Sequence, residues 1–187
     1  MNLKVTLLFF LAIAPAFGAK PPALDIKATR AMADQGNPDA QTLLGQAYHE
    51  GWGLRKDFAE AAKWFRKAAE QGSPKAQGQL GLLYQTGEGV PQDFSLSVKW
   101  YRAGAEQGDV DAQWHLGVMY NTGRGVPQDF VQAHMWVNVA ASRATGAQQF
   151  VLSSVRAEIA KQMSAEQIAT AQELAREWKP KNIEVGR

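Results

Sequence analysis

The strongest constraint on the fold of this chain is a repeat with a period of 36 residues. Three segments align without gaps, 33–68, 69–104 and 105–140, and the second and third agree at half of their positions. A fixed period of this length is typical of a solenoid, in which one supersecondary unit stacks on the next. The recurring Leu-Gly pair, Tyr and Trp are expected to form the repeat core: Leu44, Gly45, Tyr48, Trp64, Leu80, Gly81, Tyr84, Trp100, Leu116, Gly117, Tyr120 and Trp136.

Each repeat is predicted to contain two helices joined by a glycine-rich turn. The first helix follows a residue whose side-chain oxygen can accept from free amides, namely Asn37, Ser73 or Asp109. It ends at paired glycines such as Gly51 and Gly53, because glycine tolerates the positive φ of a chain reversal. The second helix follows Asp57, Asp93 or Asp129. The chain is therefore expected to be all-α, a stack of antiparallel helix pairs.

Further residues define how these helices begin and pack. Glu60 and Gln132 stand three residues after the capping Asp and are expected to complete capping boxes, as is Gln167 after Ser164. The recurring residues of the first helix share one face, on which Gly45 and its copies should let the second helix approach closely. These faces are predicted to form the core.

The recurring residues resemble the Sel-like repeat family, longer relatives of the tetratricopeptide repeat. The shared pattern is Ala-Gln-x-x-Leu-Gly-x-x-Tyr-x-x-Gly-x-Gly-x-x-x-Asp-Phe-x-x-(Ala/Ser)-x-x-Trp, and the resemblance covers about Ala28 to Trp178. It implies a right-handed α-solenoid. We expect a signal peptide over 1–18, a linker and capping helix over 19–36, three repeats over 37–144, a C-terminal capping repeat over 145–180 and a tail over 181–187.

The first residues have the features of a cleavable secretory signal. A single Lys4 precedes an apolar stretch that closes on small residues around Ala16 and Gly18, and the polar, Pro-rich Lys20 to Pro22 follows. The stretch is too short for a comfortable membrane span, so no stable membrane insertion is expected after cleavage. The predicted location is periplasmic or secreted. The chain has no cysteine, so stability must come from packing alone.

The sequence contains no pattern that predicts catalysis, and we expect no enzymatic activity, no cofactor and no metal site. His49, His115 and His134 have no partner at metal-ligand spacing and are expected to be solvated surface residues, as are carboxylates such as Asp111. Some disulfide-rich members of the resembling family have been called β-lactamases, but this chain has no Cys, Ser-x-x-Lys or Lys-Thr-Gly. A formal charge of +2 does not favour nucleic acid as a partner.

A comparison of the repeats with each other predicts where a partner binds. Residues on the face of the first helix opposite the recurring stripe are expected to line a concave groove. There the polar residues of the first repeat give way to Leu82, Trp114 and Val118, with Phe150 in the matching column of the cap. We predict an apolar recognition patch with His49, Gln85 and Asn121 as its polar rim. The alternative for Trp114 and Phe150 is that they pack the cap helix.

Two functions of different kind fit this sequence. The resemblance implies a scaffold that binds a protein or peptide partner in the cell envelope. The alternative is a protein that binds the glycan of peptidoglycan, for which Trp114 and Trp52 would serve as aromatic platforms. A hydrolase is a distant third.

The signal peptide yields the first testable prediction. When the protein is expressed in a bacterium with its full leader, the mature chain should begin at Ala19 or within about three residues of it. Mass measurement of the N-terminal peptide tests this. An intact Met1 on membrane-bound protein would contradict it.

Overall fold

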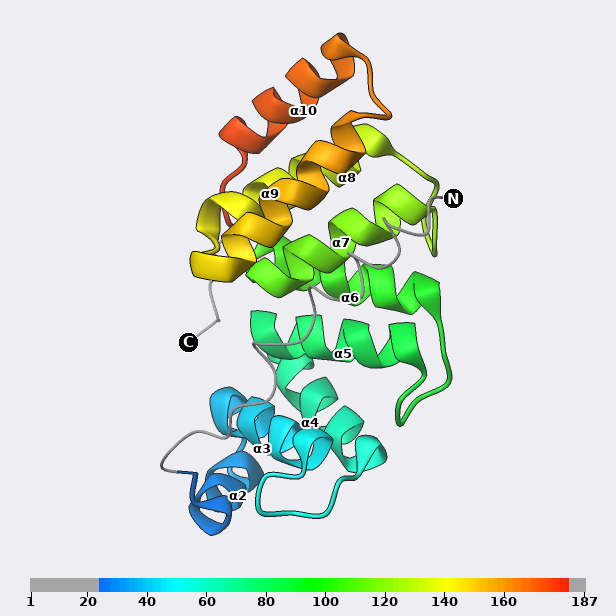
Figure 1. Ribbon diagram of the computed structural model, residues 1–187. Helices are drawn as coiled ribbons and strands as arrows, with labels where there is room; N and C mark the ends of the chain where they lie inside the picture. The colour runs from blue at the N-terminus through cyan, green and yellow to red at the C-terminus, as the bar shows by residue number, and fades with distance from the viewer. Residues whose placement is uncertain (1–23, 182–187) are drawn as a thin grey trace.

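The computed structural model describes residues 24–181, and within that range every regular element is an α-helix (Figure 1). The helices are α2 (Ile26–Asp34), α3 (Pro38–Glu50), α4 (Phe58–Glu70), α5 (Pro74–Thr86), α6 (Phe94–Glu106), α7 (Val110–Thr122), α8 (Phe130–Arg143), α9 (Gly146–Ala160) and α10 (Ala165–Glu177). From α2 to α9 each helix packs on the next to form an elongated stack, and α10 packs on α8. The expected all-α repeat solenoid is confirmed, whereas the predicted signal peptide lies outside the described residues.

The helices begin where the capping residues predict. The side chain of Asn37 accepts from Ala40 N at 2.9 Å, and that of Asp57 accepts from Glu60 N at 3.0 Å. The capping box at Ser164 and Gln167 forms in full. The box expected at Glu60 does not form, because its carboxylate accepts from Lys63 Nζ instead. The box expected at Gln132 is also incomplete. The backbone N–H of Gln132 donates to the side chain of Asp129, but the side chain of Gln132 makes no hydrogen bond back to the backbone of Asp129.

Each repeat is held together where a first-helix glycine meets a second-helix side chain. A Cβ placed on Gly45 would lie 2.7 Å from the ring of Phe65, and one on Gly81 would lie 2.7 Å from the ring of Tyr101. Gly117 has the same relation to Val137. Carbon atoms at these distances would overlap, so only glycine allows this packing. The predicted close approach is confirmed.

A second glycine contact joins one repeat to the next. The second glycine of each Gly-x-Gly turn lies against the start of the preceding second helix. A Cβ on Gly89 would lie 2.1 Å from Phe58 O, and one on Gly125 would lie 2.2 Å from Phe94 O. Both glycines also have a positive φ. The turn therefore fixes the spacing between neighbouring repeats as well as reversing the chain.

Two rows of side-chain hydrogen bonds also link the helices. Arg66 donates to the hydroxyl of Tyr84, and Arg102 donates to that of Tyr120, each at 2.9 Å; Arg30 and Tyr48 form the same pair one repeat earlier. In the other row, Gln77 Nε2 donates to Ala69 O and Gln113 Nε2 to Ala105 O, each at 3.1 Å. Gln107 then donates to Gln77 Oε1 at 2.6 Å.

The predicted core residues are not all equally buried. Trp64 and Trp136 are buried, and Leu44, Leu80 and Leu116 are fully enclosed. Trp100 and the three repeat tyrosines, however, are half-buried and lie at the core edge. The tyrosines need this position because their hydroxyls accept from arginines whose charge must reach water.

The C-terminal cap departs from the expected repeat. In the three inner repeats the second helix packs against the first, but α10 packs on α8 rather than on α9. Ala171 of α10 lies in the cluster that contains Trp136, and the rings of Trp136 and Trp178 meet edge to face with centroids 6.0 Å apart. Lys181 beyond α10 pairs with Glu106 at 2.9 Å. The last two helices are thus a cap without the repeat geometry.

The expectation of solvated surface histidines is wrong for His115 and His134. His115 and His134 are 5% and 3% exposed. The ring of His115 stacks on Tyr101, with centroids 4.9 Å apart and planes 6° from parallel. Burial lowers the pKa of His115 to about 4. This residue therefore belongs to the interface between the second and third repeats and is neutral at pH 7.

The glycine contact between repeats gives a prediction for stability. Gly89→Ala introduces both a strained positive φ and an overlap with the backbone of Phe58, whereas Gly72→Ala introduces only the strain, because no atom lies within 4 Å of the new Cβ. We expect Gly72→Ala to cost about 1–2 kcal/mol. Gly89→Ala should cost about 2 kcal/mol more, since overpacking adds to the strain. Equal losses in urea unfolding would show that the turn does not set the repeat spacing.

The buried His115 gives a prediction for the pH dependence of stability. Its folded pKa of about 4 lies below the usual 6.5, so the unfolded chain binds more protons between those values and stability falls as the pH drops. Gln79 holds the same position one repeat earlier, which makes His115→Gln a conservative test. Relative to this variant, the wild type should lose about 2 kcal/mol of unfolding free energy between pH 7.5 and pH 5. A constant difference between the two proteins across that range would contradict a neutral, buried His115.

Candidate functional site

The first helices α3, α5 and α7 and the cap helix α9 present the face on which a partner site was expected; we call it the first-helix face. The residues predicted to line it fall in three columns, one repeat apart in each: Thr42, Gly78 and Trp114; Gln46, Leu82 and Val118; and His49, Gln85 and Asn121. The structure gives these three columns different environments. The column of Trp114 packs between repeats, the column of Leu82 and Val118 lies at the edge of the core, and the column of His49 and Gln85 takes part in polar contacts.

The column that contains Trp114 does not lie open on this face. Thr42 is buried beside Ser73, with their hydroxyl oxygens 3.2 Å apart, and Gly78 lies against Asp109 and Ala112. Each of these residues therefore faces the first helix of the next repeat. Trp114 is 5% exposed and packs in the cluster that holds Leu152 and Val155 of α9. The expectation that Trp114 anchors an open patch is wrong, because its ring packs against the cap.

Phe150 occupies the same column but has the opposite environment. The helix after α9, α10, packs on α8, and nothing in the described part of the chain covers this position. The side chain is 75% exposed, more than any other large apolar residue among those described. Phe150 was expected either to line the groove or to pack the cap helix. It does not pack the cap, and it lies on α9 at the end of the stack.

Leu82 and Val118 keep a surface position. Both are half-buried, as are Gln46 and Ser154 in the same column. Leu82 packs at the edge of the cluster with Leu116 and Met119, and Val118 packs at the edge of the cluster with Trp114. Each therefore rests on a rigid base and has part of its side chain free for contact. Of the predicted apolar residues, these two occupy one column of adjacent repeats and keep part of their side chains exposed.

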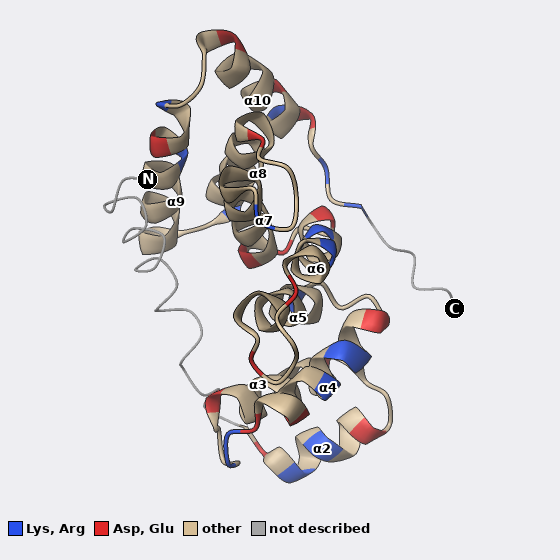
Figure 2. Ribbon diagram, turned by 90° about the vertical axis from the view of Figure 1, so that its right-hand side faces the viewer, with Lys and Arg blue, Asp and Glu red and all other residues tan. Residues whose placement is uncertain are grey.

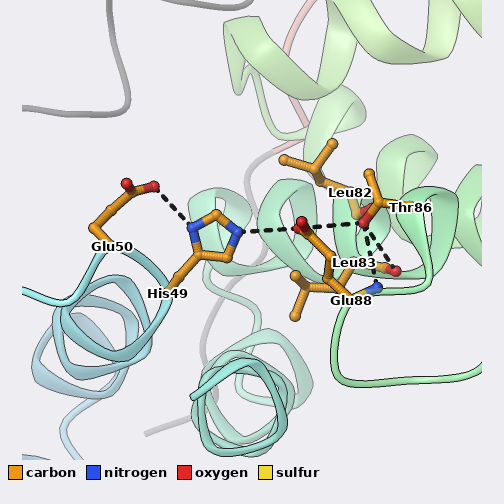
Figure 3. A network of polar contacts seen from close by, with 6 residues as sticks. All are labelled: His49, Glu50, Leu82, Leu83, Thr86 and Glu88. Carbon is orange, nitrogen blue, oxygen red and sulfur yellow. Dashed lines mark hydrogen bonds and ion pairs between the residues drawn. The ribbon is translucent and has the colours of Figure 1, made fainter. Parts of the chain in front are cut away.

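The polar residues beside them are held in defined orientations. His49 Nδ1 lies 2.8 Å from Glu50 Oε1, and its Nε2 lies 3.4 Å from Glu88 Oε2, which is an ion-pair distance rather than a hydrogen bond (Figure 3). His49 thus bridges the first repeat to the turn of the second. Gln85 accepts from the hydroxyl of Tyr101 at 2.7 Å. Burial raises the pKa of Tyr101 well above its usual value, so this hydroxyl stays protonated.

Charged residues near the start of α7 also contribute, among them Asp111, which was expected to be a solvated surface residue. Burial raises the pKa of Asp109 to about 6 and raises that of Asp111, and Lys75 acts against both shifts by its positive charge. Gln148 of α9 donates to Asp111 at 3.0 Å. Asp111 is therefore not the solvated surface carboxylate that was expected. The alternation Asp39, Lys75, Asp111 in one column was the available signal for a charged strip along this face.

The structure gives no constellation that fits a metal site or a membrane span in its described part. Among residues 24–181, no group of three or more His, Cys, Asp or Glu side chains is placed to hold a metal ion. None of the helices in this range has the length and apolar character needed to cross a bilayer. Basic and acidic residues both occur along the whole stack (Figure 2).

Comparisons with known proteins agree with the repeat architecture. A comparison with curated proteins gives no match. A Sel1 repeat protein from Oxalobacter formigenes is 38% identical, with a TM-score of 0.60, and the match covers 70% of this chain and 98% of that one. The c5321 protein, a protective antigen of uropathogenic Escherichia coli with an SLR fold, is 29% identical, with a TM-score of 0.62. That match covers 94% of this chain and 44% of that longer protein.

The family model for the Sel1 repeat matches three consecutive segments, 38–73, 74–109 and 110–144. These segments correspond to the helix pairs α3–α4, α5–α6 and α7–α8. They make up more than half of the chain. The protein therefore belongs to the Sel1 repeat family.

Proposed function

We propose that this protein is an exported interaction module that binds an extended segment of a protein partner on the first-helix face, across α5 and α7. Proteins of Sel1 repeats are generally protein-interaction modules, which supports the class of function. The predicted leader supports export to the periplasm or beyond. The observation that carries the location of the site is the pair Leu82 and Val118, which are half-exposed on a rigid base in the same column of adjacent repeats.

The spacing of this pair suggests the form of the partner segment. Helices in contact lie about 8–10 Å apart, and α5 and α7 are in contact. A chain in the polyproline II conformation rises about 3.1 Å per residue and turns once in three residues. Side chains three residues apart then point the same way at a spacing of about 9 Å. A segment with small apolar residues at positions i and i+3 would therefore meet both Leu82 and Val118.

Polar groups beside the pair can bind the backbone of such a segment. The hydroxyl of Tyr101 donates to the side-chain oxygen of Gln85 and so orients this side chain. The amide nitrogen of Gln85 can then donate to a carbonyl of the partner. Lys75 and Asp111 offer opposite charges on the same face. A partner that matches this alternation would bind in one direction, since reversing it would place like charges together.

The peptidoglycan alternative loses one of the two aromatic platforms on which it depended. Trp114 is buried against the cap, so its ring face is not available to a sugar. Trp52 remains half-exposed in the first turn. A single ring supplies less of the stacking surface that glycan recognition would use, and the protein partner is therefore the better-supported proposal.

A double substitution tests the site. Leu82→Ser with Val118→Ser should weaken the complex with a partner isolated from envelope extract about thirtyfold, because each change removes about 1 kcal/mol of apolar contact. The affinity is measured by calorimetry with the purified partner. Gln46→Ser, in the same column of the first repeat, is the matched control and should change the affinity less than about twofold.

Stability must be measured with binding, because both residues also touch the core. The two changes are expected to leave the helix content intact and the double variant folded at the temperature of the titration. Trp114→Ala should instead lower stability and binding together, since it removes a buried ring. Wild-type affinity in the folded double variant would refute the proposed site. Retention of the mature protein by insoluble peptidoglycan, abolished by Trp52→Ala, would favour the glycan alternative.

A further inference from the structure

A second candidate site lies at the C-terminal end of the stack, among α8, α9 and α10. It is an open pocket of about 520 Å³, within the range of sites that bind small ligands or the end of a peptide. Two guanidinium groups line it, from Arg156 and Arg176, and none of its described lining residues carries a carboxylate. The pocket is therefore positively charged, although the whole chain has a formal charge of only +2.

The pocket exists because the cap departs from the repeat geometry. In the inner repeats a second helix covers the first helix, with Gly45, Gly81 and Gly117 at the contact. The corresponding residue of α9 is Ser153, and α10 packs on α8 instead of on α9. The side of α9 that carries Arg156 and Ala160 is left facing the pocket.

The repeat sequence also changes at this place, in a way that moves a positive charge. In the inner repeats an arginine of the second helix donates to a tyrosine of the next first helix, as Arg102 does to Tyr120. One repeat later, Asn138 takes the position of the arginine and Arg156 takes the position of the tyrosine. The arginine is now on the first helix, α9, and it donates to Asn138 of the second helix, α8. The exchange replaces a tyrosine ring by a guanidinium group at the pocket wall and holds that group in place.

A third change places a histidine in the wall. The position of Ala62 and Val98 in the earlier repeats is taken by His134, which is 3% exposed. Its Nδ1 is buried and has no hydrogen-bond partner among the described residues. Burial and the charge of Arg156 lower the pKa of His134, so the ring is neutral at pH 7. Buried polar groups in proteins normally have partners, so an unpaired nitrogen in a pocket wall is consistent with a site that a ligand completes.

We propose that this pocket binds the carboxylate at the C-terminus of a peptide whose last side chain is small and aliphatic. The planar guanidinium group matches a carboxylate in geometry and charge. Ile168, Ala157 and Ala160 provide an apolar wall beside the two arginines. A peptide end presents the same combination, a carboxylate next to an aliphatic side chain, whereas inorganic phosphate has no apolar part. This pocket shares α9 with the first-helix face, but its lining includes neither Leu82 nor Val118, and the proposal does not depend on them.

The test uses the purified chain and an acetylated tripeptide that ends in valine. Calorimetry compares the free C-terminal carboxylate with its amide, and inorganic phosphate is titrated separately. The carboxylate peptide should bind, and Arg176→Gln should weaken it about tenfold or more. Arg176 is exposed, and its Nε donates to the backbone oxygen of Gln172 in the same helix, so the variant should remain folded. Lys179→Gln, which removes an exposed charge outside the pocket, is the matched control and should bind like the wild type.

Each other outcome would overturn the proposal. Equal binding of the amide would mean that the carboxylate is not recognised. Stronger binding of phosphate than of the peptide would make the pocket a phosphate site. Absence of binding at millimolar concentrations, or no effect of Arg176→Gln, would mean that the pocket is not a ligand site. The double variant Leu82→Ser with Val118→Ser should bind the peptide normally, so failure here and failure of the first-helix site can be distinguished.

Discussion

The contact between a first-helix glycine and a second-helix side chain is the constraint on which the rest of this structure depends. A Cβ at Gly45, Gly81 or Gly117 would overlap its neighbour, so the two helices of each repeat are closer than other residues would allow. The turn glycines Gly89 and Gly125 set the distance to the preceding repeat in the same way. With both distances fixed, core columns such as Leu44, Leu80 and Leu116 keep the same buried environment from repeat to repeat.

This regularity explains what the sequence predicted well. The caps at Asn37 and Asp57 and the helix bounds depend on local chemistry, which a single sequence reveals. The close approach of the two helices at Gly45 and its copies could be predicted because a residue with no side chain recurs at this position in each repeat. The fold and the three repeats could therefore be predicted from the period, the caps and the glycines, without knowledge of any long-range contact.

The environment of Trp114, Phe150 and His115 could not be predicted in the same way, because it depends on what lies beyond each repeat. Trp114 and Phe150 share a column, yet Trp114 is buried by α9, whereas Phe150 is exposed because α10 packs on α8 and does not cover it. His115 is buried by stacking on Tyr101 of the preceding repeat, a contact between residues with no sequence signal of their own. The pocket near Arg156 could not be predicted for the same reason, since nothing in the repeat period indicates that α10 packs on α8 rather than on α9.

The central claim, that partners bind across α5 and α7 on the first-helix face, is tested most directly by site-specific photocrosslinking in cells. A photoreactive residue at position 82 should form an adduct with a protein partner, and one at position 99 should not. Lys99 is exposed on α6, a second helix of the same repeat and not part of the first-helix face, so it controls for expression and chance encounter. Adducts from position 82 alone are the predicted result. Equal adducts from both positions, or adducts from position 99 only, would contradict the account.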